Sequence, residues 1–196
     1  MNYILVGTYK TKPESEGWYV NNSRYRILWE KLNNKFESKY SHHDCVYNSE
    51  SIFGEIKGLN NFFFYDLKAY DFDQKGETKD SVVYNNSRED FILGMDKLLE
   101  EVKSRPKEFF RFGLQGNNTV GLLLNYLNTP ERLQEVKLSS LAKDWKNINF
   151  GRIKDINKCP VNLQMFKIYN LTQPARKKED LKNLFNKTWD DFLNLK

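Results

Sequence analysis

Short apolar runs alternate along this chain with longer segments that have helical spacing. The runs begin near residues 3, 61, 109 and 165, and each leads through a polar loop into a segment whose apolar residues recur every three or four positions. Parallel strands need crossover connections, and these place helices on both faces of a sheet. The alternation therefore predicts an α/β protein with three layers, α/β/α, around a central, mostly parallel four-stranded sheet.

The helical segments have recognisable starts. Ser23, Ser87 and Thr129 stand where N-cap residues are favoured, and Pro130 follows Thr129 at the first helical position. The predicted helices span residues 24–40, 87–104, 119–127, 129–142 and 179–195, and residues 41–58 and 143–161 are predicted to be irregular connections. No linker or composition break interrupts the 196 residues, so we expect one domain, residues 1–196.

The chain is basic, with a formal net charge of +5. A positive surface attracts phosphate backbones, although a solvated lysine surface produces the same balance. No apolar run approaches the roughly 18 residues that span a bilayer, and the first residues resemble a strand rather than a signal peptide. We therefore expect a cytoplasmic protein without a membrane partner.

Cysteine and histidine usage gives little support for a metal. The two cysteines, Cys45 and Cys159, fit neither a disulfide framework nor the paired spacing of a zinc ribbon. His42 and His43 stand next to Cys45, but adjacent side chains converge on one ion only where the backbone turns sharply. A polar loop is the simpler interpretation, and no metal is expected.

The first apolar run carries the candidate site. It stops at Gly7 and is followed by a polar loop that leads into the first predicted helix. Ligands of open α/β sheets bind beyond the carboxyl ends of the strands, so residues 7–24 are the first place to look. A strand end at Asp66 and a loop at residues 172–178 occupy equivalent positions after two other strands.

These loops resemble motifs of the uracil-DNA glycosylase superfamily, in particular its mismatch-specific (thymine) and hypoxanthine branches. Residues 6–11 (Val-Gly-Thr-Tyr-Lys-Thr) are similar to a strand that ends in a Gly-x-x-Pro-Gly loop, residues 17–20 to a Gly-x-Tyr-Tyr segment, and residues 22–29 to an Arg-Asn-Arg-Phe-Trp-like helix start. Further along, residues 65–67 are similar to Trp-Asp-Val, residues 112–116 to Phe-x-Asn-Gly, and residues 171–176 to a Leu-Pro-Ser-Thr-Ser-Pro-Ala-Asn loop. The likeness covers nearly the whole chain.

The resemblance implies a monofunctional DNA glycosylase that flips out a base, hydrolyses its N-glycosidic bond and leaves an abasic site. It implies DNA as partner, no metal or organic cofactor, and a protein that we expect to be a monomer. Three residues depart from the family pattern, namely Tyr9, Lys10 and Tyr25. These departures favour an unusual base, such as the hydroxymethylated or glucosylated cytosine of phage DNA, which would make the enzyme part of antiviral defence.

Each candidate residue has a proposed role and a structural alternative. Asp66 would position water or stabilise the sugar cation, unless it caps a turn; Tyr19 would stack on the base, unless it plugs the loop. The full set comprises catalytic residues Asp66 and Tyr9, base-binding residues Gly7, Thr8, Tyr19, Asn22 and Tyr25, and DNA-binding residues Lys10, Lys12, Arg24, Thr172, Gln173, Arg176 and Lys177. Cations at a helix entry such as Arg176 oppose the helix dipole, which favours a bound phosphate over a solvated helix start.

Three alternatives stay open. The protein could be a catalytically silent relative that binds DNA without cutting it, a conventional uracil or hypoxanthine repair glycosylase, or a small-molecule hydrolase on the same fold. Binding to phosphates would weaken steeply as salt rises, whereas binding of a small neutral substrate would not.

Overall fold

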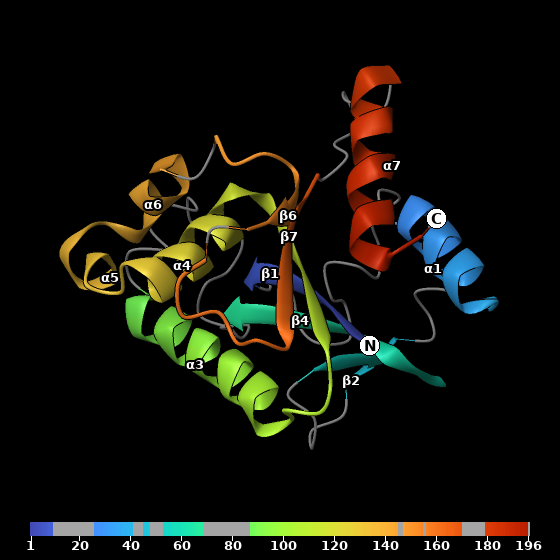
Figure 1. Ribbon diagram of the computed structural model, residues 1–196, viewed down its shortest axis with the longest axis horizontal. Coiled ribbons are helices and arrows are strands. Elements are labelled where there is room, and N and C mark those ends of the chain that lie inside the picture. Colours follow the sequence, from blue (N-terminus) through green and yellow to red (C-terminus); the bar gives the residue numbers. More distant parts are fainter. Residues whose placement is uncertain are drawn as a thin grey trace.

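The computed structural model describes residues 1–9, 26–40, 45–47, 53–68, 87–144, 147–154, 156–169 and 179–195. In these residues a seven-stranded sheet carries helices on both faces (Figure 1). The strands are β1 (Asn2–Tyr9), β2 (Cys45–Tyr47), β3 (Gly54–Ile56), β4 (Leu59–Lys68), β5 (Phe110–Gln115), β6 (Gly151–Ile153) and β7 (Leu163–Ile168). The helices are α1 (Arg26–Phe36), α3 (Arg88–Ser104), α4 (Gly116–Asn128), α5 (Arg132–Glu135), α6 (Leu138–Asp144) and α7 (Glu179–Leu193).

The strand order is β2-β3-β4-β1-β5-β7-β6, and the middle four strands run parallel to one another. These four are the strands that the apolar runs predict, and the three-layer α/β class is confirmed. The prediction of a four-stranded sheet is wrong, because antiparallel β3 and β2 extend one edge and antiparallel β6 extends the other. Each added strand has three residues, too few to show the alternation by which a strand is recognised.

The sheet buries a separate apolar cluster on each face. Ile4 and Val6 of β1 pack with α3, α4, α5 and α6, and this side of the sheet is called the α4 face. Tyr3 and Leu5 point the other way and pack with α1 and α7 on the α7 face. Figure 1 shows the two helix groups on opposite sides of the sheet. None of the described helices is both long and apolar enough to cross a membrane.

The segment predicted as one helix over residues 129–142 is divided into α5 and α6. Val136 adopts an extended conformation (φ −109°, ψ 160°), which interrupts the helix. The guanidinium of Arg88 donates a hydrogen bond of 2.8 Å to the Val136 carbonyl, so the break is held against the start of α3. Helix α4, by contrast, begins at Gly116, three residues earlier than the spacing predicts.

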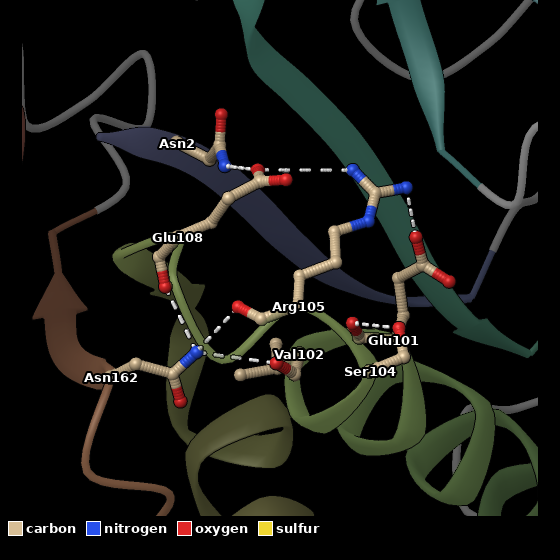
Figure 2. Close-up of polar contacts among 7 residues, drawn as sticks. All are labelled: Asn2, Glu101, Val102, Ser104, Arg105, Glu108 and Asn162. Carbon is tan, nitrogen blue, oxygen red and sulfur yellow. Dashed lines mark hydrogen bonds and ion pairs between the residues drawn. The ribbon is translucent and has the colours of Figure 1, made fainter.

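A polar network ties the end of α3 to the starts of three strands (Figure 2). The Asn162 side-chain amide donates to the carbonyl oxygens of Val102 (3.2 Å), Arg105 (3.2 Å) and Glu108 (2.9 Å). The Glu108 carboxylate accepts a 2.5 Å hydrogen bond from the Asn2 side chain. Because the last carbonyls of a helix have no partner within it, Asn162 stabilises the α3 terminus and fixes the amino-terminal edge of the parallel strands.

Candidate functional site

The four parallel strands end at the same edge of the sheet, which is where α/β proteins bind ligands. Gly7 of β1 is the register partner of Asp66 in β4. On the other side of β1, Val6 pairs with Leu114, so the next residue, Gln115, lies beside Gly7 at the end of β5. Gln115 in turn pairs with Ile168 of β7. The edge therefore presents an acid, a glycine, an amide and an apolar residue in consecutive strands.

Side-chain alternation places the acid and the amide on the same face. Phe64 and Leu5 belong to the cluster of the α7 face, so Asp66 and Gly7, two positions further along their strands, share that face. On β5, a Cβ at Gly113 would meet Ile168 and Phe192, which assigns Gln115 to the α7 face as well. Asp66 and Gln115 are separated by two strand spacings, about 10 Å between backbones, with only the glycine between them.

The side-chain amide of Gln115 has a buried donor whose partner is not among the described residues. Its side chain is 8% exposed, and its Nε2 is buried without a hydrogen-bond partner among the residues that the structure describes. A buried amide donor left without a partner costs about 1–3 kcal/mol, a cost that proteins rarely retain without a function. A ligand oxygen at this position would satisfy the donor.

The start of α4 adds further donors to this edge. Gly116 has φ +75°, a conformation that favours glycine, and a Cβ placed there would meet nothing within 4 Å. The 13-residue helix that follows directs its first-turn N–H groups and the positive end of its dipole toward the strand ends. Negative charge that develops on a bound molecule would be stabilised here.

Asp66 is half-buried beside a tyrosine whose titration it influences. Burial and, to a smaller extent, the negative charge of Asp66 together raise the pKa of Tyr65 to about 12. The Tyr65 hydroxyl points to the α4 face, where it donates a 2.7 Å hydrogen bond to the Gly94 carbonyl. Tyr65 therefore stays neutral at physiological pH and holds the strand end that carries Asp66.

Thr8 lies on the opposite face from Asp66 and Gln115. Its hydroxyl is 2.9 Å from the hydroxyl of Thr119 in α4, and Thr119 donates a 2.7 Å hydrogen bond to the Gln115 carbonyl. These contacts join the ends of β1 and β5 through the first turn of α4. The role of Thr8 in binding a base stays a prediction, and the contact that the structure gives it is one that positions Gln115.

Most of the other predicted site residues lie outside the described residues. Tyr9 is the last residue of β1 and pairs with Lys68, but its side chain is not among those described. Lys68 is buried, and its ammonium forms a 2.7 Å ion pair with Asp90 at the start of α3. The residues outside the described ranges are Lys10, Lys12, Tyr19, Asn22, Arg24, Tyr25, Thr172, Gln173, Arg176 and Lys177.

Gln115 falls within the predicted motif at residues 112–116 but is not among the predicted site residues. A polar side chain directly after a fully buried apolar strand, and directly before a glycine that starts a helix, is the signal that identifies it. Its importance depends on the lack of a partner among the described residues, which only the packed structure reveals.

No arrangement typical of a metal centre occurs in the described part of the chain, where no three His, Cys, Asp or Glu residues lie close enough to share an ion. Cys159 is half-buried, and burial raises the pKa of its thiol, which disfavours the reactive thiolate. The chemistry that the described edge supports is therefore that of a carboxylate, an amide and helix N–H groups.

Comparison with known proteins identifies no relative. No protein-family model matches the chain, and no curated protein matches it at a significant level. The resemblance to glycosylases thus stays a prediction from the motif residues.

Proposed function

We propose that this protein is a monofunctional DNA glycosylase that flips out a damaged or modified base and hydrolyses its N-glycosidic bond. The observation that carries the proposal is the arrangement of Asp66, Gly7 and Gln115 on one face of three neighbouring strand ends. It supplies a carboxylate and an amide about two strand spacings apart, with a side-chain-free floor between them.

Hydrolysis of this bond needs stabilisation of opposite charges on its two sides. The sugar develops positive charge as the C1′–N bond breaks, and the Asp66 carboxylate is suited to stabilise it and to orient water. The water oxygen bonds to C1′, the electron pair of the broken bond stays on the base nitrogen, and the proton from water is taken up by Asp66 or solvent. Gln115 and the α4 N–H groups would stabilise the departing base.

The residues beyond the strand ends complete the proposed site. Tyr19 would stack on the extruded base, and Asn22 and Tyr25 would contact its edge. Lys10, Lys12 and Arg24 from the first loop, with Thr172, Gln173, Arg176 and Lys177 from the last, would bind phosphates on either side. These roles come from the sequence motifs.

The base is proposed to be a bulky modified pyrimidine, such as the hydroxymethylated or glucosylated cytosine of phage DNA. Tyr9, Lys10 and Tyr25 replace the family residues that shape a small uracil or hypoxanthine pocket. Excision of such a base from invading DNA would serve antiviral defence, whereas excision of uracil or hypoxanthine would serve repair.

A base-release screen tests the proposal. Purified protein is incubated with DNA that contains uracil, hypoxanthine, 5-hydroxymethylcytosine or glucosylated hydroxymethylcytosine, and the free bases are identified by mass spectrometry. We expect release of a modified cytosine together with alkali-labile sites. If uracil DNA is cut and modified DNA is not, the modified-base proposal is wrong and the repair function replaces it.

The Asp66→Asn variant distinguishes a glycosylase from a protein that binds DNA without catalysis. An enzyme loses base release by about 100-fold or more, while DNA binding persists. Glu89→Gln, an exposed carboxylate in the first turn of α3, is the matched control and should leave release unchanged. Absence of release from every DNA, with binding that weakens as salt rises, would identify a DNA-binding protein without catalysis.

A further inference from the structure

Three large apolar side chains are exposed together at the amino-terminal edge of the parallel strands. Met1, Phe109 and Val161 directly precede or adjoin the starts of β1, β5 and β7, and their side chains are 56%, 57% and 102% exposed. Single exposed apolar residues are common, but a contiguous group on one edge is typical of an interaction site. This edge lies at the opposite end of the strands from Asp66 and Gln115.

Backbone hydrogen bonds hold these three residues side by side. The Asn2 N–H donates to the Phe109 carbonyl at 2.8 Å, and the Phe110 N–H donates to the Asn162 carbonyl at 2.8 Å. Met1 and Val161 each precede a bonded residue, so they lie near Phe109 on its two sides, in the strand order β1-β5-β7. We call Met1, Phe109 and Val161 the apolar edge.

The polar network of Figure 2 makes the apolar edge rigid. Asn162 follows Val161 and fixes three carbonyls at the end of α3, and Asn2 follows Met1 and binds Glu108 next to Phe109. A preorganised surface loses little conformational entropy when a partner binds.

A hollow of about 380 Å³ opens beside Val161. It lies between the end of β6, residues 156–161 and the first residues of β7. Its apolar lining consists of Ile153, Ile156, Pro160, Leu163 and Met165, with the half-buried Cys159. The hollow is large enough to receive an apolar side chain from a partner that rests on the apolar edge.

The charge around the apolar edge is positive. Lys107 stands two residues before Phe109, Lys158 stands three before Val161, and Lys154 lines the hollow; all three are exposed. None of them forms an ion pair with another residue that the structure describes. The carboxylates of Glu101 and Glu108, by contrast, are engaged by Arg105 and Asn2. Within the described part of the chain, no carboxylate neutralises these three lysines, which suits an acidic partner.

We propose that the apolar edge and the adjoining hollow form a docking site for an acidic protein segment that carries apolar side chains. The apolar residues of the segment contact Phe109 and Val161 and fill the hollow, and its carboxylates pair with Lys107, Lys154 and Lys158. An anionic membrane offers the same charge, but a bilayer surface does not enter a hollow between a strand and a loop. Docking here leaves the candidate site free, so it would recruit the protein without blocking catalysis.

Selection from a random-peptide display library on the full-length protein tests the docking site. The enriched peptides should have net negative charge and at least two apolar residues, and should bind with a dissociation constant on the order of 10 μM, in the range of weak signalling contacts. Enrichment of basic or neutral peptides, or no enrichment, would overturn the proposal. So would binding of the protein to phosphatidylserine vesicles in the absence of peptide binding.

Matched variants locate the site. Val161→Asp and the triple charge reversal Lys107→Glu, Lys154→Glu, Lys158→Glu should each weaken peptide binding by tenfold or more. Leu93→Asp, at a side chain that is 52% exposed on α3, and Lys97→Glu on the same helix should leave binding unchanged. Equal affinity for the Val161→Asp variant and for the native protein would contradict the proposal, whatever the outcome of the base-release screen.

Discussion

Gly7 and Asp66 are register partners on neighbouring parallel strands, and both face α7. Because Gly7 has no side chain, the carboxylate of Asp66 and the amide of Gln115 lie on either side of a buried glycine on the middle strand. An apolar side chain at position 7 would extend the core to the strand ends and separate these two groups. The glycine thus keeps the strand end between these two groups free of a side chain.

The first prediction concerns this glycine. Gly7→Val should abolish base release, since a branched side chain would occupy the space between Asp66 and Gln115. Gly7 does not have a positive φ, so the backbone of β1 can accept a β-branched residue, and the melting temperature checks that the variant still folds. Non-specific DNA affinity should also persist, as measured by fluorescence anisotropy. Gly7→Ala is the graded control, with a smaller loss; full activity of Gly7→Val would show that the base binds elsewhere.

The second prediction separates stability from function at Gln115. Gln115→Leu removes a buried donor that has no partner among the described residues, so the free energy of unfolding should rise by about 1–2 kcal/mol while base release falls by about 100-fold. Asn125 is the matched control, because its buried amide donates to the Gly121 carbonyl at 2.8 Å and accepts from Thr129. Asn125→Leu should therefore destabilise the protein in denaturant titrations. Destabilisation by both variants would show that Gln115 has a structural partner.

The central strands were predictable because each contains a continuous apolar run, such as Phe62 to Phe64 in β4. The edge strands were not, since three residues carry no periodicity and their pairing depends on contacts with β4 and β7. The end of helix α5 at Val136 was also not predictable from the sequence, because only the tertiary contact of Val136 with Arg88 explains where α5 stops.

The sequence indicates which strand ends carry the candidate site better than it indicates which side chains belong to it. A strand end at Asp66 was expected, and the structure places Asp66 beside Gly7, two residues before β4 ends. Gln115 was missed because the sequence gives no sign that its amide lacks a partner. The base-binding role of Thr8 stays a prediction, and strand alternation directs its hydroxyl to Thr119 on the other face.

The third prediction concerns two glycines where helices and side chains approach the sheet. A Cβ at Gly94 would lie 1.7 Å from the Leu67 carbonyl oxygen, so backbone must move. A Cβ at Gly113 would lie 2.4 Å from Cδ1 of Ile168, a side-chain end that can shift. We expect Gly94→Ala to cost about 3–5 kcal/mol, Gly113→Ala about 1–3 kcal/mol, and the exposed control Lys97→Ala less than about 0.5 kcal/mol. Thermal denaturation ranks the three, and a native melting temperature for Gly94→Ala would contradict the close packing of α3 on β4.

The fourth prediction follows from the raised pKa of Tyr65. Between the ordinary value of 10.0 and the folded value of about 12, the unfolded chain loses the phenolic proton and the folded protein keeps it. The unfolded state is therefore favoured as pH rises. The stability that neutral Tyr65 contributes to the folded protein is fully present below pH 10 and is lost by pH 12. The free energy of unfolding should fall by about 2–3 kcal/mol across this window from Tyr65 alone.

Tyr65→Phe isolates that contribution. The variant loses the hydrogen bond to the Gly94 carbonyl, about 1 kcal/mol at neutral pH, but its stability should fall less steeply above pH 10. Tyr126→Phe provides the comparison, since burial and the hydrogen bond to Asp96 raise the pKa of Tyr126 to about 12 at a more exposed position, where solvent weakens the effect. Urea titrations between pH 10 and pH 12 give, for each of the two variants, the slope of the unfolding free energy against pH. A native-like slope in Tyr65→Phe would mean that another group controls alkaline unfolding, and that the carboxylate of Asp66 acts on Tyr65 less than their adjacent positions imply.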